Sequence, residues 1–175
     1  MLLYALIIIG FIYIDQLTKW LAVTYLRGQP SFPLIKDVLH LTYLENRGAA
    51  FGLMQNYRWV FISVSVVAII ILSVFLFKRY KSLPPMAELS LSLIIAGGIG
   101  NMIDRIFLGY VVDFVDFTLI NFAVFNAADA CVSIGAVLLC VYVLFFSEKQ
   151  DNGKAKEPLK ATADKKNEKE KNEDD

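Results

Sequence analysis

Apolar residues fill four long runs of this chain, and polar residues gather near the ends of those runs. The runs cover Leu2–Tyr25, Trp59–Phe77, Met86–Ile106 and Asn126–Phe146. Each is close to the roughly 20 residues that an α-helix needs to cross about 30 Å of hydrocarbon. The pattern therefore predicts a mainly α membrane protein with four transmembrane helices.

The composition divides the chain into an apolar body, residues 1–146, and a charged tail, residues 147–175. Hydrophobic residues make up 57% of the sequence, and the mean hydropathy is +0.54. The tail carries 8 Lys and 9 Asp or Glu in 29 residues. Such a mixed-charge segment cannot bury a core, so it is expected to be disordered. Its deletion is expected to leave the function of the apolar body intact.

Positive charges indicate how the body lies in the membrane. Lys78, Arg79 and Lys81 form the short loop between the second and third runs, and residues 107–125 contain no Lys or Arg. Loops rich in Lys and Arg stay in the cytosol. Both termini are therefore predicted to be cytosolic, with 26–58 and 107–125 outside. The first run lacks a basic start and a clear cleavage site, so we expect a retained span rather than a signal peptide.

The outer segment 26–58 has the features of a small β-rich platform. Pro30 and Pro33 oppose a helix, and Val38–Leu44 alternates between apolar and mixed positions, as a short strand does. A run of small residues follows, which lets another chain approach closely: Glu45-Asn46-Arg47-Gly48-Ala49-Ala50-Phe51-Gly52. Four apolar residues are expected to dip into the lipid headgroups: Phe32, Leu53, Met54 and Tyr57.

Ionisable residues in and beside the apolar runs suggest a functional site, because burying a charge in hydrocarbon is expensive. The predicted orientation brings the notable polar residues, ionisable or amide, to the outer leaflet: Asp15, Lys19, Asn101, Asp104, Arg105, Asp113, Asp116, Asn126 and Asp129. No track of charges continues toward the cytosol, as a transport pathway would usually show. Asp15 and Lys19 lie four residues apart on one helix face and are expected to pair in support of the site.

Several clustered carboxylates favour acid–base chemistry. Two carboxylates held close together cannot easily both ionise, so one keeps a proton and acts as acid while the other acts as base. Such a pair can activate water against an amide without a metal or a covalent intermediate. Asp113 could fold back over Asp129, but Asp104 and Asp116 compete for the partner role. His40 is the single histidine, so a histidine-dependent metal site or a Ser-His-Asp triad is not expected.

Structural roles are the alternative for these residues. Asp129 and Asn126 share a helix face at a helix start, where Asp and Asn are common N-caps. Arg105 could simply pair with Asp104 or reach lipid headgroups. The gathering of all these residues on one side of the membrane favours the functional interpretation.

Five motifs resemble those of the bacterial lipoprotein signal peptidases, or signal peptidase II, which are aspartic proteases of the cytoplasmic membrane. The resemblance covers nearly everything except the tail. The motifs are Asp15-Gln16-Leu17-Thr18-Lys19, Asn46-Arg47-Gly48-Ala49-Ala50-Phe51, Gly100-Asn101-Met102-Ile103-Asp104-Arg105, Val111-Val112-Asp113-Phe114 and Phe125-Asn126-Ala127-Ala128-Asp129. The order and spacing of all five make the likeness specific.

The resemblance implies roles for individual residues. Asp113 and Asp129 match the family's catalytic dyad, which leaves Asp104 a structural role at the end of the third span. Positions that contact substrate or peptide-like inhibitor in the family match Asn46, Asn101, Arg105 and Asn126. Supporting positions match Asp15, Lys19, Asp104 and Gly48. No cofactor or metal is expected.

The resemblance also implies a substrate. Family members remove the signal peptide from diacylglyceryl-modified prolipoproteins just before the lipidated cysteine, and globomycin inhibits them. A lipid-modified peptide is confined to the outer leaflet, where the polar residues of this chain are expected. Its acyl chains could stay in the bilayer while the scissile bond meets the two aspartates.

Other functions remain possible from the sequence alone. A presenilin-type protease would need a Gly-x-Gly-Asp motif, which the chain lacks. A Ser–Lys peptidase would need a serine near Lys19, for which Asp15 already competes. A small ion-coupled transporter would require polar groups through both leaflets. A non-catalytic assembly factor would keep its activity when both aspartates are replaced.

Overall fold

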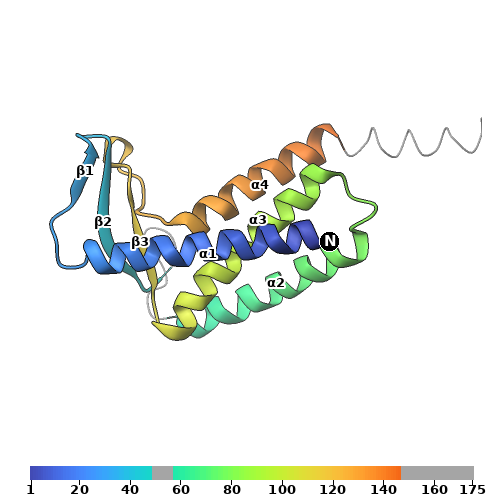
Figure 1. Ribbon diagram of the computed structural model, residues 1–175, viewed down its shortest axis with the longest axis horizontal. Coiled ribbons are helices and arrows are strands. Elements are labelled where there is room, and N and C mark those ends of the chain that lie inside the picture. Colours follow the sequence, from blue (N-terminus) through green and yellow to red (C-terminus); the bar gives the residue numbers. More distant parts are fainter. Residues whose placement is uncertain (49–56, 147–175) are drawn as a thin grey trace, which may run out of the picture. The chain divides into compact units, whose positions relative to one another are not determined.

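The computed structural model describes residues 1–48 and 57–146, in which four helices and a three-stranded sheet are found (Figure 1). In chain order the elements are α1 (Leu2–Tyr25), β1 (Phe32–Ile35), β2 (Leu39–Asn46), α2 (Arg58–Arg79), α3 (Pro85–Phe107), β3 (Val111–Asp116), the 3₁₀ turn η2 (Thr118–Ile120) and α4 (Ala127–Phe145). All four α-helices are long and apolar enough to cross a membrane. The predicted fold class, a four-span membrane protein with a small β platform, is confirmed.

Helix bounds follow the predicted runs to within two residues. α1 matches its run, while α2 and α3 each extend slightly beyond theirs. α3 begins with Pro85 at its first position, where a missing N–H costs nothing. α4 begins one residue later than predicted, because Asn126 caps the helix instead of joining it.

The chain divides into two units, Met1–Leu138 and Leu139–Asp175. The first contains α1–α3, the sheet and most of α4, and it holds everything described below. The second contains the last residues of α4 within the described part of the chain. Three of the predicted features lie outside the described residues: the small-residue run from Ala49 to Gly52, the apolar pair Leu53 and Met54, and the tail 147–175.

α3 is the central helix of the first unit. Within its most apolar window 56% of the residues are buried, against 17% for α1 and 11% for α2. Both α1 and α2 pack against α3. Glycines allow α4 to approach closely: a side chain at Gly97 would collide with the Ala128 carbonyl oxygen, and one at Gly135 with the Ser90 carbonyl oxygen. The outer faces of α1 and α2 keep large apolar side chains exposed, as lipid contact requires.

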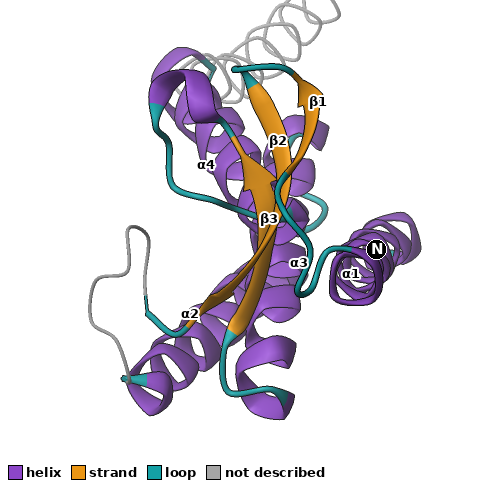
Figure 2. Cartoon of the chain, turned by 90° about the vertical axis from the view of Figure 1, so that its left-hand side faces the viewer, coloured by secondary structure: helices purple, strands orange, loops and turns teal. Residues whose placement is uncertain are grey.

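The sheet is antiparallel in the order β1-β2-β3 and stands at one end of α1 (Figures 1 and 2). β2 confirms the strand predicted at Val38–Leu44, shifted by one or two residues. The strand β3 corrects the prediction for residues 107–125, which were expected to form only a loop. Its sequence Val-Val-Asp-Phe-Val-Asp is rich in β-branched and aromatic residues, and β2 supplies the partner that a lone short strand lacks.

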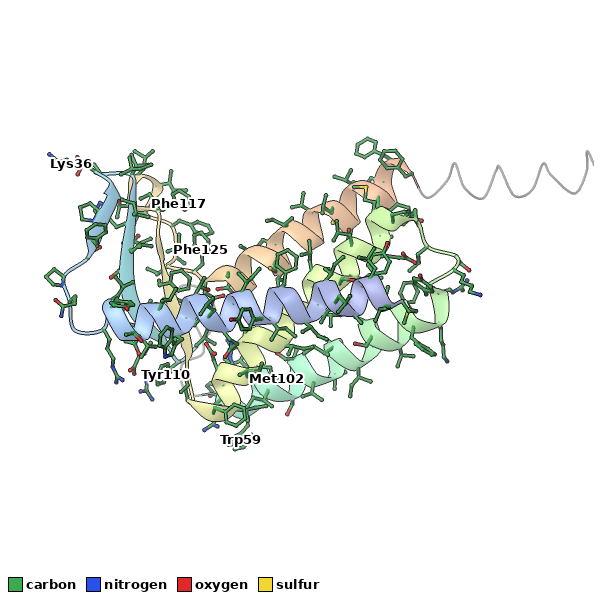
Figure 3. The ribbon with its side chains drawn as sticks, in the orientation of Figure 1. Lys36, Trp59, Met102, Tyr110, Phe117 and Phe125 are labelled. Atoms are coloured by element: carbon green, nitrogen blue, oxygen red, sulfur yellow. The ribbon has the colours of Figure 1, made fainter. Side chains whose placement is uncertain are left out.

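The segment after β3 turns back on the strand. Asn121 adopts a left-handed conformation with φ 50°, which reverses the chain. Phe125 then pairs its backbone with Val115, in both N–H···O directions at 3.0 and 2.9 Å. The rings of Phe117 and Phe125 stack with centroids 5.9 Å apart and lie side by side in Figure 3. This return brings the start of α4 beside β3.

Candidate active site

Two carboxylates from different elements meet through a pair of amide side chains. Asn126 Nδ2 donates to Asp113 Oδ1 at 2.6 Å and to Asn101 Oδ1 at 3.1 Å. Asn101 Nδ2 donates to Asp129 Oδ1 at 2.7 Å. Asp113 of β3 and Asp129 of α4 are thus joined by a short chain of hydrogen bonds. The structure brings together the two aspartates that the resemblance selected.

Asp129 also closes the first turn of α4. Asn126 Oδ1 accepts from the Asp129 backbone N–H at 3.0 Å, and Asp129 Oδ2 accepts from the Asn126 N–H at 3.3 Å. This reciprocal pair is a capping box with Asp in the third position. The N-cap interpretation is therefore correct for Asn126. It is compatible with a chemical role, because the cap fixes the Asp129 carboxylate relative to Asp113.

Asn46 connects the platform to Asp113. Its Nδ2 donates to Asp113 Oδ2 at 2.9 Å, while its Oδ1 accepts from the Gly48 N–H at 3.0 Å. Because the Gly48 N–H must face an oxygen, the amide of Asn46 is oriented with its NH₂ group toward the carboxylate. Both oxygens of Asp113 consequently accept a hydrogen bond, and the side chain is almost fully buried.

Arg105 lies beside these residues without pairing to Asp104. Its guanidinium donates to the Asn101 and Gly48 carbonyl oxygens, each at 3.3 Å, and covers the Phe61 ring at 5.1 Å. The alternative of an Arg105–Asp104 pair is wrong, because Asp104 bonds to Lys19 instead. Arg105 remains available to a ligand that brings carbonyl or carboxylate oxygens.

Asp15 and Lys19 form the predicted ion pair, with Nζ–Oδ2 at 2.9 Å. Lys19 Nζ also reaches Asp104 Oδ2 at 3.1 Å. Asp116 does not join this group. It lies at the other end of β3, in register with His40. Asp104 and Asp116 were the two alternative members of the carboxylate pair. Asp104 is occupied by structural contacts, and Asp116 lies at a different position on β3.

Burial raises the pKa of Asp113 to about 6, since desolvation disfavours the carboxylate and the charge of Asp129 adds to the effect. Hydrogen bonds from Asn46 and Asn126 and the charge of Lys19 act in the opposite direction. A carboxyl with this pKa holds or releases its proton near neutral pH. That property suits an acid–base pair.

A cavity of about 660 Å³ opens beside the carboxylates. Asp129, Asn101 and Arg105 contribute polar groups to its wall, and apolar side chains of α2, α3 and α4 form most of the rest, among them Ile69, Leu72, Ile94, Val132 and Ile134. Residues 122–125 also line the cavity. An apolar peptide segment could lie in this cavity with one peptide bond against Asp129.

Two features were missed by sequence reasoning. Gln16 donates to both Asp15 and Asp104, at 3.1 Å each, a role that no local pattern reveals. Glu88 is buried near the start of α3, far from Asp104 at the end of the same helix, and has the Tyr4 hydroxyl as a partner. Glu88 was not among the polar residues expected to gather, and it lies at the other end of α3 from Asp104. Within residues 1–48 and 57–146, no group of His, Cys, Asp and Glu could hold a metal ion.

Comparison with known proteins identifies the family of this chain. The family signal peptidase (SPase) II matches residues 7–145. A lipoprotein signal peptidase of Clostridioides difficile is 48% identical over 85% of this chain and 99% of its own length. One from Brevibacillus brevis is 46% identical over 83% of this chain and 97% of its own length.

Solved structures support the same assignment. A bacterial membrane enzyme structure superposes with a TM-score of 0.75 and 32% identity, covering 81% of this chain and 87% of that one. A second superposes with a TM-score of 0.73 at the same 32% identity. The chain, a multi-pass membrane protein with an aspartate pair beside an apolar cavity, belongs to the signal peptidase II family of aspartic peptidases.

Proposed function

We propose that this protein is a lipoprotein signal peptidase that cleaves diacylglyceryl-modified prolipoproteins just before the lipidated cysteine. Family membership and relatives that bear this name over nearly their whole length support the substrate class. The observation that carries the chemistry is the chain of hydrogen bonds through Asn126 and Asn101 that links Asp113 to Asp129, which lines an apolar cavity.

The pair shares one proton during the reaction. The ionised carboxylate takes a proton from water as the oxygen attacks the scissile carbonyl carbon, and the protonated one donates to the carbonyl oxygen. The tetrahedral intermediate collapses when the C–N bond breaks and the leaving amine takes up a proton. The pKa of Asp113, raised to about 6, suits a proton carrier in this cycle. Asp129 lines the cavity, where water and substrate would meet its carboxylate.

The neighbouring polar groups position the substrate. Asn101, Arg105 and Asn46 line the cavity and present amide and guanidinium donors. These donors match peptide carbonyl oxygens on either side of the scissile bond. A cyclic peptide inhibitor such as globomycin would occupy the same position. The apolar walls from α2 and α4 suit the hydrophobic part of a signal peptide.

The proposal includes an orientation, in which the site lies at the outer leaflet of the bacterial cytoplasmic membrane and both termini lie in the cytosol. The charges of the 78–81 loop and the lack of Lys and Arg in 107–125 support this orientation. A Lys36→Cys variant without the native cysteines should react with an impermeant maleimide in intact cells. Lys81→Cys should react only after permeabilisation, and the reverse pattern would contradict the orientation.

Cleavage of a purified diacylated precursor in detergent tests the activity. Asp113→Asn and Asp129→Asn should each lose about 10²–10⁴-fold in rate, while Asp116→Asn should remain close to the parent. Globomycin should block the parent enzyme. Normal turnover by the first two variants would refute the dyad and favour a non-catalytic assembly factor. Ion flux in proteoliposomes without any cleavage would favour a transporter.

A further inference from the structure

Each aspartate of the pair is preceded by a residue whose backbone N–H is bonded by a buried carboxylate. Asp104 Oδ2 accepts from the Val112 N–H at 3.1 Å, one residue before Asp113. Asp15 Oδ1 accepts from the Ala128 N–H at 2.8 Å, one residue before Asp129. Both accepting carboxylates are at most 3% exposed. β3 and α4 are thus held at equivalent points by two side chains from outside the dyad.

Lys19 joins those two carboxylates. Its ammonium lies 2.9 Å from Asp15 Oδ2 and 3.1 Å from Asp104 Oδ2. Gln16 Nε2 forms a second bridge between the same carboxylates, at 3.1 Å to each. Gly100 makes room for this approach, because a side-chain carbon there would lie 2.5 Å from Asp15 Oδ2. The two anchors are therefore one assembly.

The third N–H donor of Lys19 affects Asp129 through the side chain of Asn101. Lys19 Nζ donates to Asn101 Oδ1 at 3.0 Å. An ammonium has donors and no acceptor, so it must face the amide oxygen of Asn101. The NH₂ group of Asn101 then points the other way and donates to Asp129 Oδ1 at 2.7 Å. Lys19 consequently determines which end of this amide meets the carboxylate.

We propose that Lys19 is a positioning residue, which sets the spacing and the hydrogen bonding of Asp113 and Asp129 through Asp104, Asp15 and Asn101. The inference rests on the proposed role of the two aspartates. It assigns Lys19 no contact with substrate. The ammonium uses all three donors inside the protein and is 3% exposed, so it has none left for a ligand.

Because Lys19 is charged, its positioning role can be measured in the pH dependence of the cleavage rate, which a purely structural lysine would not change. The charged groups that face Asp113 are Asp129 from α4, Lys19 from α1 and Arg105 from α3. Lys19 favours the ionised form of Asp113. Its loss should therefore move the basic limb of the rate profile to higher pH while the other two charges stay in place.

The test compares Lys19→Met, Lys19→Gln and the control Lys36→Met, whose lysine is exposed beyond β1 (Figure 3). For each variant, kcat and KM for diacylated precursor are measured against pH, together with thermal unfolding in detergent. We expect kcat of Lys19→Met to fall about 10²-fold, as a small misplacement of reacting groups does. KM should stay within about threefold. Lys19→Gln keeps a neutral N–H donor and should recover part of kcat, and Lys36→Met should match the parent.

Parental kcat and an unshifted basic limb in folded Lys19→Met would overturn the proposal. If Lys19→Met does not fold, Lys19→Gln decides: a fall in kcat with a shifted limb supports positioning, and an unshifted limb with parental kcat overturns it. Failure of the dyad itself is recognised separately, because Asp113→Asn and Asp129→Asn would then stay active whatever Lys19 does.

Discussion

The two ends of α3 each bury a carboxylate, yet they differ in what surrounds it. Asp104 near the sheet is 3% exposed and Glu88 near the helix start is 5% exposed. Sixteen residues separate them, or about 24 Å along the helix. Asp104 has partners from α1 and β3, whereas Glu88 has the Tyr4 hydroxyl and the favourable N-terminal dipole of its own helix.

The comparison teaches that burial of a carboxylate does not make a site by itself. At the Asp104 end, β3 supplies the backbone N–H of Val112 as a donor to the carboxylate. The backbone pairing of Phe125 with β3 also brings the start of α4 close to this end. At the Glu88 end, the helices meet around a mostly apolar groove of about 520 Å³, lined by residues such as Ile8, Leu76 and Ile95. We therefore expect chemistry at one end and helix packing at the other.

Replacing each carboxylate by its amide tests this difference most strongly. Asp104→Asn removes a charge that Lys19 and the Val112 N–H both require, so β3 should shift and the cleavage rate should fall about 10²-fold. Glu88→Gln, the matched control on the same helix, should stay within about threefold of the parent. A precursor-cleavage assay with both variants checks this. Equal losses in the two variants would remove the distinction between the ends.

A glycine pair tests the packing behind the site. Gly100→Ala would place a carbon 2.5 Å from Asp15 Oδ2, and such overpacking destabilises proteins by about 1–3 kcal/mol. Gly10→Ala on α1 has nothing within 4 Å of the new carbon and should stabilise the helix by roughly 0.5–1 kcal/mol. Thermal unfolding in detergent measures both, and a Gly100→Ala variant as stable as Gly10→Ala would contradict the described contact.

The pH dependence gives a smaller and more local effect. With the pKa of Asp113 at about 6, the shared proton is present below that pH, and the rate should fall as the pH rises through it. The raised pKa also means that folded protein binds this proton more tightly than unfolded protein, so stability should decrease as the pH rises from 3.8 toward about 6. Thermal unfolding across this range follows the second effect.

Asn46→Ala sharpens the same prediction. The loss of the Asn46 amide removes a hydrogen bond that favours the ionised form of Asp113. The fall of the cleavage rate on the basic side of its pH profile should therefore move to higher pH. Glu45→Gln, the neighbour on β2, lacks that contact and should leave the limb in place. A rate profile for the two variants decides the point, and an identical limb in both would show that Asn46 does not act on the titrating group.

The helices were predictable because their signal is local. A run of apolar residues long enough to span hydrocarbon identifies a helix without reference to the rest of the chain. The bounds of α1 show this, since they match the run Leu2–Tyr25. The motifs also contained the residues that the structure brings together around Asp113 and Asp129, because an Asp or Asn at the end of an apolar run is easily recognised in the sequence.

The remaining features depend on partners far away in sequence. β3 is a strand because β2 pairs with it, and the loop expectation for 107–125 could not include that partner. Lys19 contacts Asp104 although the two residues are 85 positions apart in the sequence. The sequence alone does not reveal this contact, so the neighbouring Arg105 was an equally good candidate to pair with Asp104. Gln16 lacked a role for the same reason, since its bridge from Asp15 ends at Asp104 on another helix.

The most direct test of the central claim is whether Asp113 and Asp129 act as one unit. Cleavage rates of the diacylated precursor are measured for Asp113→Asn, Asp129→Asn and the double variant, each shown to be folded. Residues that act together have strongly non-additive effects, so the double variant should lose no more rate than either single variant. Single losses that multiply in the double variant, or a single variant at the parental rate, would contradict the shared-proton mechanism.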